Sequence, residues 1–156
     1  MKKITILLFA MISLLSFKNQ ASAQISVSAN INIASQPAWA PVGYDYARYY
    51  YFPDIDVYYS IPRQQFVYQS GNSWLFASSL PSRFHYDVYS GYKVVINDPK
   101  PYLKPGFYRN KYGSFKGTHQ KQVIIRDSRE EKYYVVKGHP MHEQYVRTHP
   151  AKKYQH

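Results

Sequence analysis

The sequence has no cysteine, and acidic residues and glycine are scarce, with nine Asp and Glu and seven Gly among 156 residues. The lack of cysteine excludes disulfides, thiolate metal sites, a cysteine nucleophile and a lipid-modified N-terminal cysteine. Because 20 Lys and Arg stand against so few acidic residues, the formal charge is +11. A chain of this length holds one small domain, and its 18 tyrosines favour pleated, half-buried surfaces, which predicts a mainly β fold.

The one long apolar run lies near the N-terminus, at residues 4–17, directly after Lys2 and Lys3. An Ala-Ser-Ala sequence at 21–23 follows it, and this order is typical of a secretory signal peptide spanning residues 1–23. A helix over that run would reach about 21 Å, less than the ~30 Å hydrocarbon core, which disfavours a transmembrane anchor. We therefore expect an exported chain that begins at Gln24 and lies in the periplasm or outside the cell, without a lipid anchor.

Charge divides the rest of the chain into two parts. Residues 24–99 contain four basic and five acidic residues, whereas residues 100–156 contain 13 basic and four acidic residues. Most aromatic residues lie in the first part, and five of the six histidines lie in the second. We predict an N-terminal strand or linker at 24–43, a Tyr-rich antiparallel β domain at 44–110, and a basic, largely irregular and partly disordered tail at 111–156.

Residue patterns predict a small meander of antiparallel strands. Alternating apolar and polar residues at 25–33 fit a strand with one apolar face, and a disordered leader after the cleavage site fits as well. We interpret residues 36–43 as a linker, because two prolines flank Trp39 there. Runs rich in tyrosine and valine, bounded by Pro, Gly or Asn, give the other predicted strands, at 48–52, 56–60, 64–69, 73–78 and 92–96.

The Ser-Gly-Asn sequence at 70–72 predicts a hairpin turn, and the length of the loop decides which side chains share a face. A three-residue loop pairs Tyr68 with Trp74 and Phe66 with Phe76, so that four aromatic side chains form one buried face. A two-residue loop shifts the second strand by one residue and separates these aromatics. We favour the three-residue loop, because aromatic pairs contribute up to ~1 kcal/mol each and asparagine tolerates the left-handed position such a loop needs.

The tail carries weaker signals. Its β-prone runs at 123–125 and 133–136 predict a small hairpin, although Ser128 and Glu131 also match the capping box of a helix. Residues 140–149 predict a short helix with a proline in its first turn and another proline after its end. Elsewhere the tail has few apolar residues per charge, so we expect it to be less ordered than the β domain.

Several motifs of the aromatic part resemble those of a family of small exported proteins of Gram-negative bacteria. They are Tyr-Tyr-Tyr-Phe-Pro-Asp at 49–54, Val-Tyr-Tyr at 57–59, Phe-Val-Tyr at 66–68, Trp74, Ser-Leu-Pro at 79–81, Gly-Tyr-Lys-Val-Val-Ile-Asn at 91–97 and Lys-Pro-Tyr at 100–102. The similarity covers residues 36–112. This family has no established function, so the resemblance implies export and a β domain and supplies no catalytic or binding residues.

The sequence contains no complete catalytic motif. The run Gly-Asn-Ser-Trp-Leu at 71–75 lacks the second glycine of G-x-S-x-G and lies in a hairpin instead of a strand-to-helix turn. Asp54 and Asp56 would point to one side of a strand as a carboxylate pair, although Asp54 after a proline is also a typical turn residue. The His-Pro-Met-His-Glu run at 139–143 does not match a zinc-ligand motif. We expect no enzyme activity, no cofactor and no specific metal site.

Two groups of residues are candidate binding sites. The predicted strands carry tyrosine on both faces, so some rings should be exposed and able to stack on sugar rings or peptide side chains. This candidate platform consists of Tyr49, Tyr51, Tyr58 and Trp74. The basic tail offers cations to phosphate or carboxylate polymers, and its candidate residues are Lys116, Lys121, Arg126, Lys152 and Lys153.

Together these features predict an exported envelope or secreted protein of a non-enzymatic, binding or structural type. Its expected partner is an anionic envelope polysaccharide, a glycan or another envelope protein rather than nucleic acid, because export removes the chain from the cytoplasm. The alternative is an envelope hydrolase or a cation-binding protein that uses Asp54 and Asp56.

Overall fold

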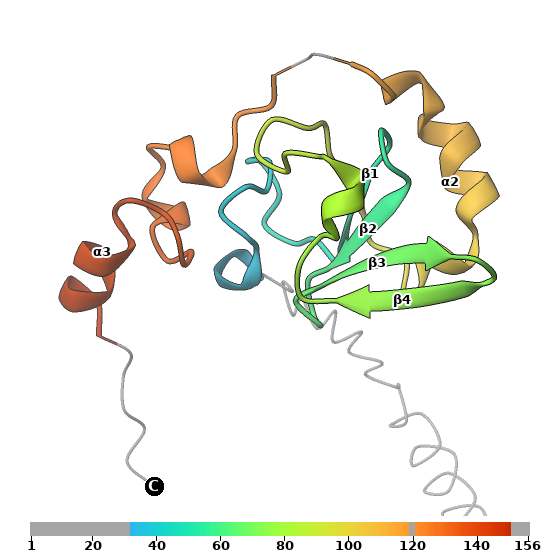
Figure 1. Ribbon diagram of the computed structural model, residues 1–156. Coiled ribbons are helices and arrows are strands. Elements are labelled where there is room, and N and C mark those ends of the chain that lie inside the picture. The colour runs from blue at the N-terminus through green and yellow to red at the C-terminus, as the bar shows by residue number, and fades with distance from the viewer. Residues whose placement is uncertain (1–31, 119–120, 151–156) are drawn as a thin grey trace, which may run out of the picture. The chain divides into compact units, whose positions relative to one another are not determined.

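The computed structural model describes residues 32–118 and 121–150, and its central element is a five-stranded antiparallel sheet (Figure 1). The strands are β1 (Tyr49–Phe52), β2 (Val57–Ser60), β3 (Gln65–Ser70), β4 (Ser73–Ala77) and β5 (Val94–Ile96). Their spatial order is β4-β3-β2-β1-β5, so β4 and β5 form the edges. The strands predicted between residues 48 and 96 are confirmed, and so is the small, mainly β domain.

Both faces of the sheet are buried, because successive side chains of each strand enter two different aromatic clusters. On the face that we call the Trp39 face, the sheet side chains around Trp39 are Tyr50, Phe52, Val57, Tyr59, Phe66 and Tyr68. The opposite face, the α2 face, is covered by η3 (Pro101–Leu103) and by helix α2 (Pro105–Tyr112). Figure 1 shows α2 and the segment at 32–46 on opposite sides of the sheet.

The segment 36–43, predicted to be a linker, is part of the core. The ring of Trp39 lies 4.9 Å from that of Tyr59 and 5.5 Å from those of Tyr50 and Phe52. Gln36 is also buried, and its Oε1 accepts a hydrogen bond from the Tyr50 hydroxyl at 2.7 Å. The linker prediction was wrong because proline excludes regular secondary structure but does not exclude burial.

The β3–β4 hairpin has a two-residue loop, so the predicted three-residue loop was wrong. Tyr68 lies opposite Leu75 rather than Trp74. Gly71, with a φ of 58°, takes the left-handed position that the prediction gave to Asn72. Glycine adopts this conformation without the steric cost of a Cβ atom, which favours the shorter loop.

This register distributes the four hairpin aromatics over both faces of the sheet. Phe66 and Tyr68 belong to the Trp39 face, whereas Trp74 and Phe76 lie on the α2 face, 5.7 and 5.6 Å from the ring of Tyr102. The prediction assumed a single buried face. Since both faces are covered, each of them requires aromatic side chains, and the alternation of the two-residue loop supplies them.

The run at 123–125 pairs with the segment 38–42 and not with residues 133–136, so the predicted small hairpin was wrong. The Ile125 N–H donates to the Ala40 carbonyl at 2.8 Å, and the Val42 N–H donates to the Val123 carbonyl at 3.0 Å. A β-bridge between Pro41 and Ile124 lies between these two bonds. The β-prone run therefore finds its partner in a segment more than 80 residues earlier in the chain.

The tail is largely irregular, as predicted, but it is not separate from the domain. Its short helices are η4 (Gly113–Phe115), η5 (Ile125–Asp127), η6 (Glu131–Tyr133) and α3 (His142–Thr148), the last of which confirms the helix predicted at 140–149. Ile125, Tyr133 and Val136 are fully buried in the cluster of the Trp39 face. The Tyr133 hydroxyl also accepts a hydrogen bond from the Gly43 N–H at 2.7 Å. Part of the basic tail is thus a layer of the core.

The two edges of the sheet differ. β5 has three residues, and the side-chain amide of Gln122 bonds both backbone groups of the preceding Lys93, at 2.8 and 2.9 Å. β4 has five residues, none of them charged or proline. Among the described residues, β4 forms backbone–backbone hydrogen bonds only within the sheet. β4 is therefore the longer and less protected edge.

The predicted signal peptide at 1–23 and most of the predicted strand at 25–33 lie outside the described residues. Where the description begins, Ile33 starts a 3-10 helix, η1 (Ile33–Ser35), instead of ending a strand. The side-chain amide of Asn32 joins η1 to the sheet, because it bonds both backbone groups of Ala47, at 2.5 and 3.0 Å.

Candidate functional site

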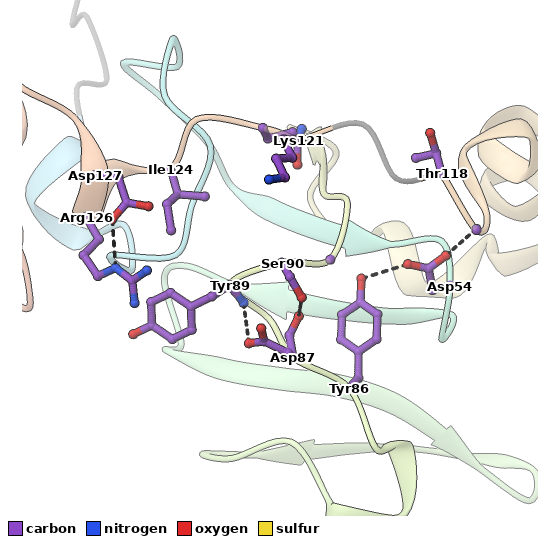
Figure 2. A pocket seen from close by; sticks show the side chains of 13 residues that line it. Asp54, Tyr86, Asp87, Tyr89, Ser90, Thr118, Lys121, Ile124, Arg126 and Asp127 are labelled. Atoms are coloured by element: carbon purple, nitrogen blue, oxygen red, sulfur yellow. Dashed lines mark hydrogen bonds and ion pairs between the residues drawn. The ribbon is translucent and has the colours of Figure 1, made fainter.

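A cleft with a volume of about 760 Å³ lies between the loop at 86–91 and the chain around residues 117–127 (Figure 2). The turn between β1 and β2 reaches its rim through Asp54. Figure 2 shows Tyr86 and Asp54 at one end of the cleft, and Tyr89 and Arg126 at the other. The cleft therefore joins the Tyr-rich part of the chain to the basic part.

Asp87 shapes the loop at 86–91. Its Oδ1 accepts a hydrogen bond from the Tyr89 N–H at 2.9 Å, and its carbonyl oxygen accepts one from the Gly91 N–H at 3.0 Å. This is the local turn that aspartate favours, in which the carboxylate bonds the backbone two residues further on. The hydrogen bond from the Tyr89 amide is the main cause that lowers the pKa of Asp87, so this group stays ionised at neutral pH.

One end of the cleft depends on a glycine and a half-buried tyrosine. A Cβ atom on Gly91 would lie 1.8 Å from the hydroxyl oxygen of Tyr86, so a larger residue there would force the Tyr86 side chain to move. The Tyr86 hydroxyl donates to Asp54 at 3.0 Å, and the other carboxylate oxygen of Asp54 accepts the Gly117 N–H at 2.6 Å. Burial, with the nearby Asp54 carboxylate, raises the pKa of Tyr86 well above its usual value.

Lys93 stabilises the loop at 86–91 through hydrogen bonds to its backbone. This lysine is almost fully buried, and its ammonium group donates to the carbonyls of Val88 and Tyr89 at 2.7 and 3.4 Å. Burial lowers the pKa of Lys93 to about 8, while the more distant Asp87 acts in the opposite direction. The Gln122 amide fixes the Lys93 backbone, so the cleft is supported from both of its walls.

Tyr89 and Arg126 come from the two opposite walls and meet at one end of the cleft. The guanidinium carbon of Arg126 lies 4.4 Å from the ring centre of Tyr89, a cation–π geometry. The Arg126 Nε also donates to Asp127 at 3.0 Å. Tyr89 remains 39% exposed, so one side of its ring is available to a ligand. Lys121, on the opposite wall, is exposed and forms no ion pair with any described residue.

The structure does not bring Asp54 and Asp56 together as a catalytic pair. Asp54 bonds Tyr86 and Gly117 on the cleft side, whereas Asp56 accepts hydrogen bonds from the Tyr51 hydroxyl and from Arg109 on the α2 face. The expectation that both point to one side was wrong, because these residues form a turn and Asp56 has a left-handed φ of 52°.

The predicted aromatic platform is assembled but covered. Tyr49, Tyr51, Tyr58 and Trp74 do share one face, and this is the α2 face of the sheet. The three tyrosines are buried there beneath η3 and α2, and Trp74 is half-buried. The expectation that some of these tyrosine rings are exposed was therefore wrong. The exposed aromatic residue of the cleft is Tyr89, which the sequence did not single out.

The predicted tail cations divide into three groups. Lys121 and Arg126 line the cleft, Lys116 is exposed away from it, and Lys152 and Lys153 lie outside the described residues. His139 is buried with both ring nitrogens engaged, one near the Ser128 carbonyl at 3.0 Å and one accepting the Met141 N–H at 3.0 Å. Within residues 32–118 and 121–150, no group of three or more metal-ligating side chains could hold a metal ion.

A second cavity, of about 570 Å³, has Tyr89 in common with the cleft. Its other walls come from the segment at 34–39, from Gln64, and from Lys137 and Gly138. The Gln64 amide donates to the Ser35 and Ile61 carbonyls at 2.7 and 3.0 Å, so this wall is tightly held. The exposed ring of Tyr89 thus stands where two hollows of the surface meet.

Comparison with models of known protein families, with curated proteins and with solved structures finds no match to this chain. In the part of the chain that the structure describes, no helix is long and apolar enough to span a membrane. The site must therefore be interpreted from its own geometry.

One sequence signal could have identified the loop of the cleft. The run Asp-Val-Tyr-Ser-Gly at 87–91 combines an aspartate that caps a turn with a glycine four residues later. An aromatic residue inside such a turn has little room to be buried, so Tyr89 was a candidate for exposure. No local pattern indicates that Lys121 and Arg126 lie across from it.

Proposed function

We propose that this is an exported protein of the cell envelope that acts by binding, and that its cleft binds an envelope glycan. The observation that carries this proposal is the half-exposed ring of Tyr89, stacked on Arg126, at the meeting point of two hollows. Binding sites commonly combine aromatic walls with a few convergent polar groups. Sugars match this arrangement, since they present a C–H face to a ring and hydroxyls to carboxylates and amides.

The charges of the cleft favour a glycan with some acidic groups over a simple polyanion. Lys121 and Arg126 can pair with a carboxylate or phosphate of the ligand. Asp54, Asp87 and Asp127 line the same cleft, and they would repel a ligand of uniformly high negative charge. Their oxygens instead suit the hydroxyl donors of a sugar. The combination of cations and carboxylates in the cleft supports a hydroxyl-rich ligand that carries a few acidic groups.

Binding is better supported than hydrolysis. Each carboxylate of the cleft already accepts hydrogen bonds from the protein itself. A glycosidase needs one carboxyl group with a raised pKa as its general acid. The pKa of Asp87 is lowered instead, and Asp54 is separated from Asp56, the partner that the alternative hydrolase requires.

The test compares Tyr89→Ala with Tyr44→Ala in the mature chain. Tyr44 is a matched control, because it is 42% exposed, close to the 39% of Tyr89, and lines neither hollow. Titration calorimetry with solubilised peptidoglycan fragments and with delipidated lipopolysaccharide polysaccharide measures the affinity. We expect Tyr89→Ala to weaken binding tenfold or more, about 1.4 kcal/mol, and Tyr44→Ala to leave it unchanged.

Two further measurements distinguish binding by the cleft from adhesion by the basic tail and from hydrolysis. Binding that falls steeply with salt and is equally strong in Tyr89→Ala would contradict recognition by the cleft and favour simple adhesion of the basic tail. Release of shortened glycan products, abolished by Asp54→Asn, would favour the hydrolase.

The export part of the proposal has its own test. Protein recovered from the periplasm or the medium should begin at Gln24 by mass spectrometry. A chain retained in the cytoplasm with residues 1–23 attached would contradict it.

A further inference from the structure

Two exposed apolar side chains lie among lysines at the start of α2. Leu103, at the end of η3, is 59% exposed, and Phe107, in the first turn of α2, is 56% exposed. Lys104 directly follows Leu103 in the chain, and the ammonium group of Lys111 lies 5.6 Å from the ring centre of Phe107. Large apolar side chains that are exposed close together in the chain indicate a contact surface.

The inner side of α2 is fixed to the sheet, which keeps these side chains outside. The ring of Tyr108 packs edge-on against Tyr58, with 6.3 Å between the ring centres, and its hydroxyl donates to Asp98. The next residue, Arg109, also connects α2 to the sheet, because its Nε donates to Asp56 at 3.2 Å. With the inner positions filled, Phe107 has no place in the core.

The segment that contains α2 carries an excess of positive charge, and the carboxylates that bond α2 are Asp56 and Asp98. Residues 100–118 contain five basic residues and no acidic residue. Of these five, only Arg109 forms an ion pair among the described residues. The four lysines, Lys100, Lys104, Lys111 and Lys116, have no carboxylate partner within that part of the chain.

We propose that α2 docks on the surface of an anionic lipid bilayer, with Leu103 and Phe107 inserted among the headgroups and the lysines at the level of the phosphates. Any polyanion would satisfy the lysines, but exposed apolar side chains gain free energy only where they leave water. Lysine stems also lie along an apolar boundary while their ammonium groups reach the phosphates. This contact goes beyond the glycan-binding function, since none of its residues lines the cleft.

The experiment measures sedimentation of the mature chain with vesicles of phosphatidylcholine alone or mixed with phosphatidylglycerol. We expect binding only to the mixed vesicles, because the lysines require anionic headgroups. Leu103→Ser combined with Phe107→Ser should weaken binding at least tenfold, and so should Lys104→Glu combined with Lys111→Glu. The matched controls are Val123→Ser, at an exposed apolar residue (61%) outside this surface, and Arg129→Glu with Lys137→Glu. Both controls should bind like the unaltered chain.

A second measurement does not depend on the stability of the serine variants. Phe107→Trp should be quenched by brominated lipids in the mixed vesicles, whereas Val123→Trp should not. Equal binding to both kinds of vesicle, absence of binding to either, or unquenched Phe107→Trp would overturn the proposal. Loss of binding in the lysine variant but not in the serine variant would also overturn it, because that result defines a general polyanion site. Failure of glycan binding in the Tyr89→Ala test leaves these expectations unchanged.

Discussion

Raising the pH above 10 should unfold this protein over a narrow range, because several of its tyrosines cannot ionise while they are buried. Burial is the main cause that raises the pKa of Tyr50, Tyr51, Tyr58 and Tyr108, and all four are almost completely buried. In the unfolded chain tyrosine has a pKa of about 10. Above that pH the unfolded state releases these protons and the folded state keeps them, so the stability present below pH 10 is lost as the pH rises.

The size of this effect follows from the number of groups. Each buried tyrosine costs ~1.4 kcal/mol of unfolding free energy per pH unit above 10, so four of them cost about 5–6 kcal/mol per unit. A small domain is stable by ~5–15 kcal/mol, and we therefore expect cooperative unfolding between about pH 11 and 12. Lys93 acts in the opposite direction, but it is a single group and its contribution ends near its unfolded pKa of 10.5.

The assay follows tyrosinate absorbance and far-ultraviolet circular dichroism in one alkaline titration. Exposed tyrosines should titrate gradually, and the remaining absorbance should appear only as the dichroism is lost. The control is Tyr58→Phe, since the Tyr58 hydroxyl forms no hydrogen bond with the described residues and its loss removes one titrating group. It should reduce the pH slope of the unfolding free energy by about a quarter. Complete tyrosinate formation near pH 10 with native dichroism would refute the reasoning.

Four other results are expected. Trp39→Ala should cost about 3–5 kcal/mol in denaturant unfolding, because its ring is buried among aromatic side chains; a cost below that of the same change at half-buried Trp74 would contradict its place in the core. Deletion of residues 121–156 should abolish cooperative melting, since it removes buried Ile125, Tyr133 and Val136, and a folded remainder would show that they are dispensable. Gly91→Ala should displace Tyr86 and lower the melting temperature by several degrees, and an unchanged value would contradict the close approach. Stability measured by denaturant should rise between pH 8 and 10, where Lys93 is neutral only in the folded state, and Lys93→Met should remove that rise.

The strands were predictable because their signals are local. Alternation, β-branched and aromatic residues, and turn residues such as Pro53 and Gly71 are all read within ten residues of the chain. The register of the β3–β4 hairpin was not predictable in the same way. It depends on whether one or both faces of the sheet are covered, and the cover of the α2 face comes from residues 101–112, beyond a long connection.

The contacts that build the site are long-range, so only part of the site could be predicted from local sequence patterns. Lys121 and Arg126 were expected to bind anions because of their charge, and they do line the cleft. The opposite wall, which contains Tyr89, comes from a loop about 30 residues earlier in the chain. Hydrogen bonds between the Gln122 side chain and the Lys93 backbone connect the two segments. No periodicity connects these segments, so composition could suggest cations and aromatic residues but not their meeting point.

The two edges of the sheet differ in how well they suit backbone pairing between copies of this chain. The longer edge is β4, where the outward N–H and C=O groups of Ser73–Ala77 have no backbone partner among the described residues. At the other edge, β5 is short and the Gln122 amide occupies the backbone groups next to it. Two copies that pair β4 against β4 would use the longer edge of each. Such a dimer would contain one continuous ten-stranded sheet whose two remaining edges are the three-residue β5 strands.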